Sequence, residues 1–362
     1  MNSSAPSLRQ RLYATCGETG YVQCHIAFWI WKTIPIGLLA FGTVGNILSL
    51  VVLMRKKLRQ SSTTVFFVCL AISDLTVTWH GPFRNMLIWV KQFEILTLSP
   101  FHCKMQEAIA HTAGGTSIWM LVLLTMERVI SVVFPMVARM SIKRKHTTIA
   151  AVSAFVINAL VNCHFILWKE LQWKSVEQKL NNTGNETASS DTASLVKVCA
   201  PTNDVYAHFL TKWWSGIVLI AYNIVPFTLI LSGNATIALT LWRRRRNMPT
   251  SSSQRSEQMQ SVTKLVFWLS GFFLLCVSPY CVFHVMFQAQ DESLSGEGIA
   301  WLQLFLAMAL MLLLSNYTFN FCFYFLTGST FRLELYALMS EINAYFRRNQ
   351  ITNSGINNPD LT

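Results

Sequence analysis

Seven long stretches with few or no charged residues constrain the fold of this chain more than any other feature. Six contain no Asp, Glu, Lys or Arg, and the second is interrupted only by Asp74 and Arg84. An α-helix needs about 20 mainly apolar residues to cross a bilayer, and each stretch reaches or approaches that length. The stretches cover residues 34–54, 65–89, 108–126, 147–168, 213–242, 265–290 and 299–326. The pattern predicts an all-α membrane protein, a bundle of seven transmembrane helices.

The charge balance supports this reading and excludes others. Only 13% of the residues are charged, whereas a soluble chain would show about 25%. The net charge of +12 would suit a nucleic-acid partner, but 17 of the 29 lysines and arginines fall in alternate connections between the stretches and in the C-terminal tail. Because such residues concentrate on the cytoplasmic side, the pattern predicts an extracellular N-terminus and a cytoplasmic C-terminus. We expect a multi-pass plasma-membrane protein, with the bilayer and not nucleic acid as its partner.

The chain divides into four parts on this basis. Residues 1–25 form an extracellular tail and residues 26–326 the transmembrane domain. In the region 327–348, residues 331–339 place apolar side chains at helical spacing, which predicts an amphipathic helix lying on the inner leaflet. The Asn-rich residues 349–362 are predicted to be a disordered cytoplasmic tail.

Two kinds of covalent modification follow from the predicted orientation. Cys103 heads the third stretch and Cys199 precedes the fifth, so both border the oxidising exterior and are natural disulfide partners. Cys16 and Cys24 remain available for a second, N-terminal bridge. Three Asn-x-Ser/Thr acceptors for glycosylation fall in predicted outer segments. They are Asn2, Asn181 and Asn185.

Polar residues inside the stretches are the candidate functional groups, because lipid offers them no partner. Asp74 is a carboxylate deep in the second stretch, and Asn46 in the first is a candidate partner for it. Glu127 and Arg128 close the third stretch as a charge pair that a conformational change can release. Arg84 either reaches the outer interface or anchors a ligand carboxylate or carbonyl.

Short motifs follow one another in a fixed order, one in each expected element. They are Gly45-Asn46, Leu70-Ala71-x-x-Asp74, Cys103 with Cys199, Glu127-Arg128-Val129 with Pro135, Pro226, Cys276-x-x-Pro279, Asn316 and Asn320-x-x-x-Tyr324, and Phe331-Arg332. On these motifs, residues from about 26 to 339 resemble the rhodopsin-like (class A) family of G-protein-coupled receptors. Gly-Asn-Ile-Leu-Ser-Leu, Arg-Gln-Ser-Ser-Thr and Ala-Ile-Ser-Asp-Leu look most similar to invertebrate neuropeptide receptors of the FMRFamide-receptor-like group.

The resemblance implies a receptor, not an enzyme, that passes binding of an extracellular ligand to a heterotrimeric G protein, with arrestin as a further partner. No cofactor is expected except an allosteric sodium ion. The implied sodium cavity consists of Asn46, Asp74, Ser117, Asn316 and Asn320. The implied activation switch consists of Glu127, Arg128, Pro279, Asn320 and Tyr324. Arg128 and Met136 are expected to contact the G protein.

The expected ligand is a peptide. Its end would face Arg84, Glu107, His111, Tyr280 and His284. The chain departs from the family at Val277, where a tryptophan is usual, and at Phe321, where a proline is usual. These departures leave open how the switch operates.

Three alternatives are weighed against this reading. A chemosensory receptor for a small environmental molecule would share the fold. A transporter would show repeated halves, and the seven unequal stretches contain no such repeat. An intramembrane enzyme would need paired catalytic groups, whereas Asp74 is a lone deep carboxylate and the eight histidines lack metal-ligand spacing.

Overall fold

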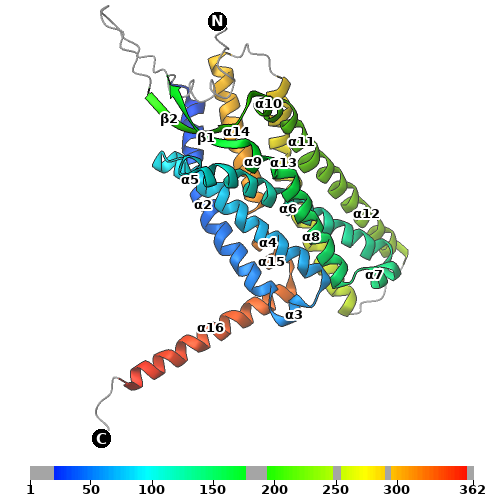
Figure 1. Ribbon diagram of the computed structural model, residues 1–362. Helices are drawn as coiled ribbons and strands as arrows, with labels where there is room; N and C mark the ends of the chain where they lie inside the picture. Colours follow the sequence, from blue (N-terminus) through cyan, green and yellow to red (C-terminus); the bar gives the residue numbers. More distant parts are fainter. Residues whose placement is uncertain (1–19, 177–193, 248–253, 290–294, 357–362) are drawn as a thin grey trace, which may run out of the picture.

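The computed structural model describes residues 20–176, 194–247, 254–289 and 295–356. Within these residues seven helices are long and apolar enough to cross a membrane, and they lie side by side as one bundle (Figure 1). The predicted fold class is therefore confirmed. The spans are Val22–Leu53, Ser62–Lys91, Pro100–Val133, Arg144–Trp168, Asp204–Arg244, Ser261–Phe283 and Gly296–Asn316.

The individual elements divide these spans further. The first four spans and their connections contain α2 (Val22–Leu53), α3 (Lys56–Arg59), α4 (Ser62–His80), α5 (Pro82–Lys91), η1 (Ile95–Thr97), α6 (Pro100–Val133), α7 (Pro135–Ser141), α8 (Arg144–Asn162) and α9 (His164–Trp168). A hairpin of β1 (Lys169–Val176) and β2 (Ser194–Pro201) follows. The rest of the chain contains α10 (Asp204–His208), η2 (Phe209–Trp214), α11 (Ser215–Leu219), η3 (Ile220–Ile224), α12 (Val225–Asn247), α13 (Gln254–Ala289), α14 (Gly296–Asn316), α15 (Asn320–Thr327) and α16 (Ser329–Ile356).

The first helix begins 12 residues before the apolar stretch at 34 that predicts it. Lys32 interrupts the apolar pattern but not the helix, because its ammonium group lies 5.4 Å from the ring centroids of both Phe28 and Trp29. A lysine whose cation lies above aromatic rings is tolerated within a helix near a membrane interface. Charge-free length therefore underestimates this helix.

The fifth span is irregular. Two π-helical segments, η2 and η3, interrupt it, and η3 ends at Ile224, two residues before Pro226. Proline lacks an N–H, so it cannot close the regular α-helical hydrogen bond to the turn before it. The wider turn of η3 occupies that position, as is common for short π-segments within α-helices.

The centre of the bundle is α6, which packs against α4, α8 and α12. Helices in lipid gain little from burying apolar surface against each other, so close approach and polar contacts decide their packing. At Gly115 of α6 an added Cβ would lie 2.2 Å from Asn158 Oδ1 and 2.5 Å from a ring carbon of Tyr222. A glycine at this position therefore lets three helices meet.

The hairpin is a feature that the sequence analysis did not predict. β1 and β2 pair antiparallel, with Leu171 opposite Cys199. The strands lie in a long polar connection, and β1 itself carries polar or charged residues at five of its eight positions, so no strong strand pattern marks it. The hairpin covers one end of the bundle, called the hairpin end below, and α16 leaves from the opposite end, called the α16 end (Figure 1).

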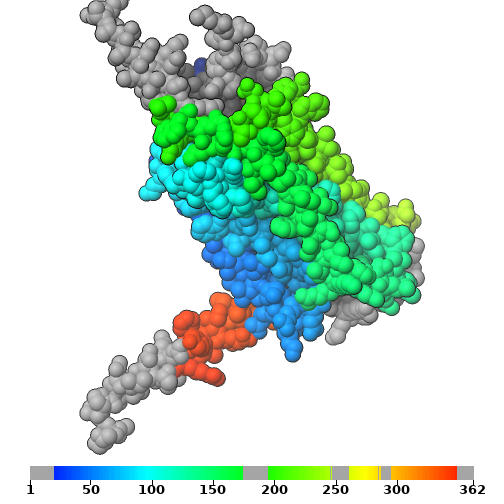
Figure 2. Space-filling model, in the orientation of Figure 1, coloured from blue at the N-terminus to red at the C-terminus, as the bar shows by residue number. Residues whose placement is uncertain are grey.

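The last helix, α16, follows the bundle and points away from it (Figure 2). Phe331 and Leu335 are buried against the bundle, whereas Leu333 and Tyr336 are exposed, which is the alternation expected of a helix with one packed side. The helix continues to Ile356, so the predicted boundary at 348, followed by a disordered tail, is wrong for residues 349–356. Polar side chains do not end a helix by themselves, and the first glycine in this segment is Gly355.

Ion pairs attach α16 to the connection between the first two spans. Arg55 Nε lies 2.7 Å from Glu334 Oε2, and Arg55 Nη2 lies 2.6 Å from Glu341 Oε1. The hydrogen bonds that Arg55 donates lower the pKa of the Glu341 carboxyl, and the same bonds to Glu341 and Glu334 raise the pKa of Arg55. Both shifts favour the charged pair.

Several sequence predictions fall outside the described residues. These are the glycosylation acceptors Asn2, Asn181 and Asn185, and also Cys16. Cys24, the expected partner of Cys16, is disulfide-bonded.

Candidate functional site

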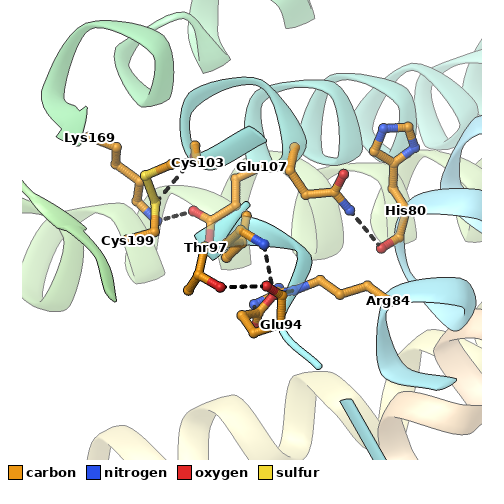
Figure 3. A network of polar contacts seen from close by, with 10 residues as sticks. His80, Arg84, Glu94, Thr97, Cys103, Glu107, Lys169 and Cys199 are labelled. Carbon is orange, nitrogen blue, oxygen red and sulfur yellow. Dashed lines mark hydrogen bonds and ion pairs between the residues drawn. A yellow bond between two sulfur atoms is a disulfide. The ribbon is translucent and has the colours of Figure 1, made fainter. Parts of the chain in front are cut away.

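The hairpin end is organised by the disulfide between Cys103 and Cys199, which the sequence analysis predicts. Their Cα atoms are 5.5 Å apart, and the bond joins the start of α6 to β2 (Figure 3). Because β2 pairs with β1, this one bond holds both strands against α6. The hairpin is thereby fixed beside the charged residues of the predicted ligand pocket.

Glu107 of α6 is paired with a residue of the hairpin. Its Oε2 accepts a hydrogen bond from Lys169 Nζ, at the first residue of β1 (Figure 3). The Lys169 ammonium also lies 5.3 Å from the centroid of the Phe165 ring. The Glu107 side chain is 22% exposed and the Lys169 side chain 10%, so this ion pair is largely but not fully buried.

Arg84 of α5 makes a second, bidentate ion pair. Its Nε and Nη2 donate to the two carboxylate oxygens of Glu94 at 2.9 and 2.7 Å (Figure 3). Glu94 Oε1 also accepts from the backbone N–H of Leu96, which holds the carboxylate at the start of η1. Arg84 is therefore neutralised by the protein itself, with both side chains about one-third exposed.

His111 lies one turn deeper on α6, on the same side as Glu107. Its ring stacks on Phe165 at 4.9 Å between centroids and 13° between planes, yet the residue remains exposed. Tyr280 of α13 is half-buried, and the side chain of His284 lies outside the described residues. The structure thus brings Glu107 and His111 together beside Lys169. Sequence reasoning missed Lys169 and Glu94 because neither is a near neighbour of its partner in the chain.

A second polar site lies in the middle of the bundle around Asp74, which is fully buried. Ser117 Oγ donates to one carboxylate oxygen at 2.5 Å, and Asn320 Nδ2 donates to the other at 2.5 Å. Asp74 of α4 is therefore joined to α6 and to α15, the segment that follows the seventh span. Charge-assisted bonds of this kind are the strong hydrogen bonds of protein interiors.

Asn46 and Asn316 complete the predicted cavity only in part. Asn46 Nδ2 donates to the backbone carbonyl of Tyr317 at 3.0 Å, and its Oδ1 is buried with no hydrogen-bond partner in the described part of the chain. Asn316 is buried, and the described contacts give it no hydrogen bond to Asp74. A carboxylate, a hydroxyl and an amide oxygen are the kinds of oxygen ligand that a small hard cation takes.

The charge pair at the α16 end is buried and shared. Arg128 Nη2 lies 2.9 Å from Glu127 Oε1, and Thr63 of α4 joins both, accepting from Arg128 and donating to Glu127 at 2.7 Å each. Glu127 and Arg128 are 5% and 7% exposed. The predicted pair is therefore present, and Thr63 adds a link to α4 that no sequence motif indicated.

The other predicted switch residues lie elsewhere in the bundle, with Asn320 at the Asp74 site. Tyr324 is buried between Phe67 and Phe331, with ring centroids 5.3 and 5.6 Å away, and its hydroxyl has no partner among the described residues. Pro279 lies inside α13, which continues through it as a helix. Met136 of α7 is 72% exposed at the same end.

The comparisons with known proteins agree with this arrangement. The chain belongs to the rhodopsin family of seven-transmembrane receptors, because the family matches residues 45–324. It is thus a multi-pass plasma-membrane receptor that responds to an extracellular ligand through a G protein, and not an enzyme.

Individual relatives are distant. The B1 bradykinin receptor of Macaca fascicularis is 24% identical over 86% of this chain and 83% of its own length. A probable G-protein coupled receptor of Caenorhabditis elegans is 24% identical over 97% of this chain and 77% of its own. The tachykinin-like peptides receptor 99D of Drosophila melanogaster is 22% identical over 87% of this chain and 58% of its own.

Proposed function

We propose that this receptor is activated by an extracellular peptide that binds at the hairpin end, as in invertebrate neuropeptide receptors of the FMRFamide-receptor-like group. The observation that carries the proposal is the pair of internal ion pairs, Arg84 with Glu94 and Lys169 with Glu107, at the predicted pocket. A ligand with charged or strongly polar groups can replace these internal partners. The name of the tachykinin-like peptides receptor, a relative, supports a peptide over a small apolar ligand.

This proposal assigns the hairpin end to the outside and the α16 end to the cytoplasm. The excess of lysine and arginine in the connections at the α16 end supports that orientation. It would expose the acceptors Asn2, Asn181 and Asn185 to glycosylation.

The proposed signal is a shift between two arrangements of the bundle, since a ligand favours the arrangement that it binds more tightly. In the inactive arrangement Glu127 and Thr63 hold Arg128. Activation frees Arg128, bends α13 at Pro279 and moves Tyr324. Met136 then contacts the G protein together with its exposed apolar neighbours Met140 and Val137, and the same surface is available to arrestin.

A sodium ion is proposed as an allosteric ligand of the central site. Asp74, Ser117 and Asn46 Oδ1 would supply its oxygen ligands, with Asn316 and Asn320 beside them. The ion would stabilise the inactive arrangement because it offsets the buried carboxylate charge. Calorimetric titration with sodium, with Asp74→Asn as the control, tests this assignment.

The first experiment is a calcium and cyclic AMP screen of cells that display the receptor, challenged with amidated and free-acid peptides. Arg128→Ala should abolish any response at unchanged surface display. Lys145→Ala, which removes an exposed cation at the same end, should leave it intact. Silence toward every peptide combined with a response to small environmental molecules would favour the chemosensory alternative.

A second experiment tests the ligand site once a peptide is found. Glu107→Gln should lower its potency by about 10- to 100-fold, because a hydrogen bond to a charged group is worth about 1.5–3 kcal/mol. Glu170→Gln on exposed β1 is the matched control and should not change potency. Equal effects of the two substitutions would place the ligand elsewhere.

A further inference from the structure

A groove of about 450 Å³ lies on the side of the bundle between α4, α6 and α8, which run next to one another in Figure 1. Small side chains leave this space, namely Ala108 and Ala113 on α6 and Ala151 and Ala159 on α8. The groove is separate from the ligand and sodium sites described above, because it opens outward between the helices.

The surroundings of the groove are the bilayer. Ile72, Val152 and Phe155 line it and are each more than half exposed on spans that cross the membrane. The hydroxyls of Thr76 and Thr116 donate to carbonyl groups of their own helices, so they do not seek a partner in the groove. Its lining is therefore suited to hydrocarbon.

The length of the groove indicates which hydrocarbon. Along α6 it extends from Met105 to Thr116, about 16 Å at a rise of about 1.5 Å per residue. This is close to half of a hydrocarbon core of about 30 Å. Met105 is two residues from the disulfide at Cys103, so the groove spans the depth of the leaflet at the hairpin end.

We propose that this groove binds one acyl chain of a phospholipid from that leaflet. An extended chain matches its depth and its three-sided form, and it fills space in which the lining atoms would otherwise lack contact partners. A sterol fits less well because two of the three threonine hydroxyls on the lining, those of Thr76 and Thr116, are already bonded to their own helices.

The bound chain has a defined place relative to the central site. Ser73 of α4 and Thr116 of α6 line the groove. Asp74 directly follows Ser73, and Ser117 directly follows Thr116. The hydrogen bond of 2.5 Å between Asp74 and Ser117 joins α4 to α6 directly behind the groove. An acyl chain seated there supports the same pair of helices from the lipid side.

Photolabelling of the full-length receptor in nanodiscs tests the proposal without a ligand or a G protein. The probe is phosphatidylcholine with a diazirine midway along one acyl chain, and labelled peptides are identified by mass spectrometry. Residues 105–116 of α6 should be labelled well above the average for the lipid-facing helices. Ala159→Trp, which fills the groove, should reduce that labelling at least five-fold, whereas Ala238→Trp on an exposed part of α12 should not.

Ile72→Trp provides a second filling variant at the exposed rim, where a larger side chain disturbs folding least. Loss of labelling in this variant supports the proposal even if Ala159→Trp does not fold. The proposal would be overturned if all seven spans were labelled uniformly, or if neither variant changed the labelling. The proposal would also be wrong if cholesterol displaced the phospholipid probe and a diazirine cholesterol labelled residues 105–116. The groove would then bind a sterol and not an acyl chain.

Discussion

The two ends of the bundle hold their charges in different ways. At the α16 end, Glu127 and Arg128 are almost completely buried, and Thr63 bonds to both. At the hairpin end, Arg84 and Glu94 pair with about one-third of each side chain exposed. A buried pair cannot lose one member without leaving an uncompensated charge, whereas an exposed pair exchanges its partners with water at little cost. The buried Glu127–Arg128 pair therefore resists separation until another interaction offsets the cost, whereas the Arg84–Glu94 pair can accept substitutes for its own counter-ions.

The largest effect is expected from Glu127→Ala. It leaves Arg128 buried without its carboxylate, which should reduce stability by about 3–5 kcal/mol. The purified receptor should unfold at a clearly lower temperature, measured by thermal denaturation in nanodiscs. Glu170→Ala on the exposed hairpin is the control. An equally small change in both variants would contradict the contrast between the two ends.

A smaller effect is expected at the centre from Ser117→Ala. This change removes one charge-assisted hydrogen bond to Asp74 and should cost about 1.5–3 kcal/mol in the same assay. Ser315→Ala is the matched control, because its hydroxyl bonds only to the backbone of its own helix. If the two substitutions lower the unfolding temperature equally, Asp74 does not join the helices in the way described.

Arg84→Ala should separate stability from ligand binding. The pair with Glu94 is partly exposed, so its loss should cost no more than about 1 kcal/mol in the unfolding assay. If the peptide contacts Arg84, the loss of binding free energy calculated from ligand potency in a calcium-release assay should be larger than this loss of stability. A large loss of stability with unchanged potency would make Arg84 a structural residue.

The smallest effect concerns pH and the attachment of α16. Arg55 lowers the folded-state pKa of Glu341, so this contact is complete above the ordinary glutamate pKa of about 4.3. It is lost as the pH falls through the lower, folded-state value. Energy transfer between a dye at Tyr345 and one on the bundle should therefore be constant from pH 8 to pH 5 and decrease below that range.

The control for this measurement is Glu341→Gln, which removes the titrating group. Its energy transfer should vary less with pH than that of the unchanged protein. An identical pH profile in both proteins would show that Glu341 does not hold the helix.

The sequence is most informative where partners are close in the chain or where a whole helix repeats a pattern. Glu127 and Arg128 are adjacent, and the apolar spans define seven helices without any tertiary information. The disulfide is also predictable, because only a few cysteines lie outside the spans. These features depend on local composition, which a sequence displays directly.

The remaining features depend on tertiary contacts. Lys169 and Glu107 are 62 positions apart, and only the path of the hairpin brings them together. Thr63 is an ordinary helical residue until the packing of α4 on α6 places it between two charges. The expectation of a disordered segment at 349–356 is wrong for a different reason, since composition describes how polar a helix is and not where it ends.

The π-helical segment η3 has a consequence for how related chains are aligned. A π-turn contains one residue more than the α-turn that it replaces. The helical segment after it is therefore rotated about the helix axis relative to the segment before it. Deletion of one residue within Ile220–Ile224 would convert it to a regular turn while both flanking helices kept their places. A one-residue gap in this segment is thus the expected form of divergence among relatives, and positions on opposite sides of it should be matched separately.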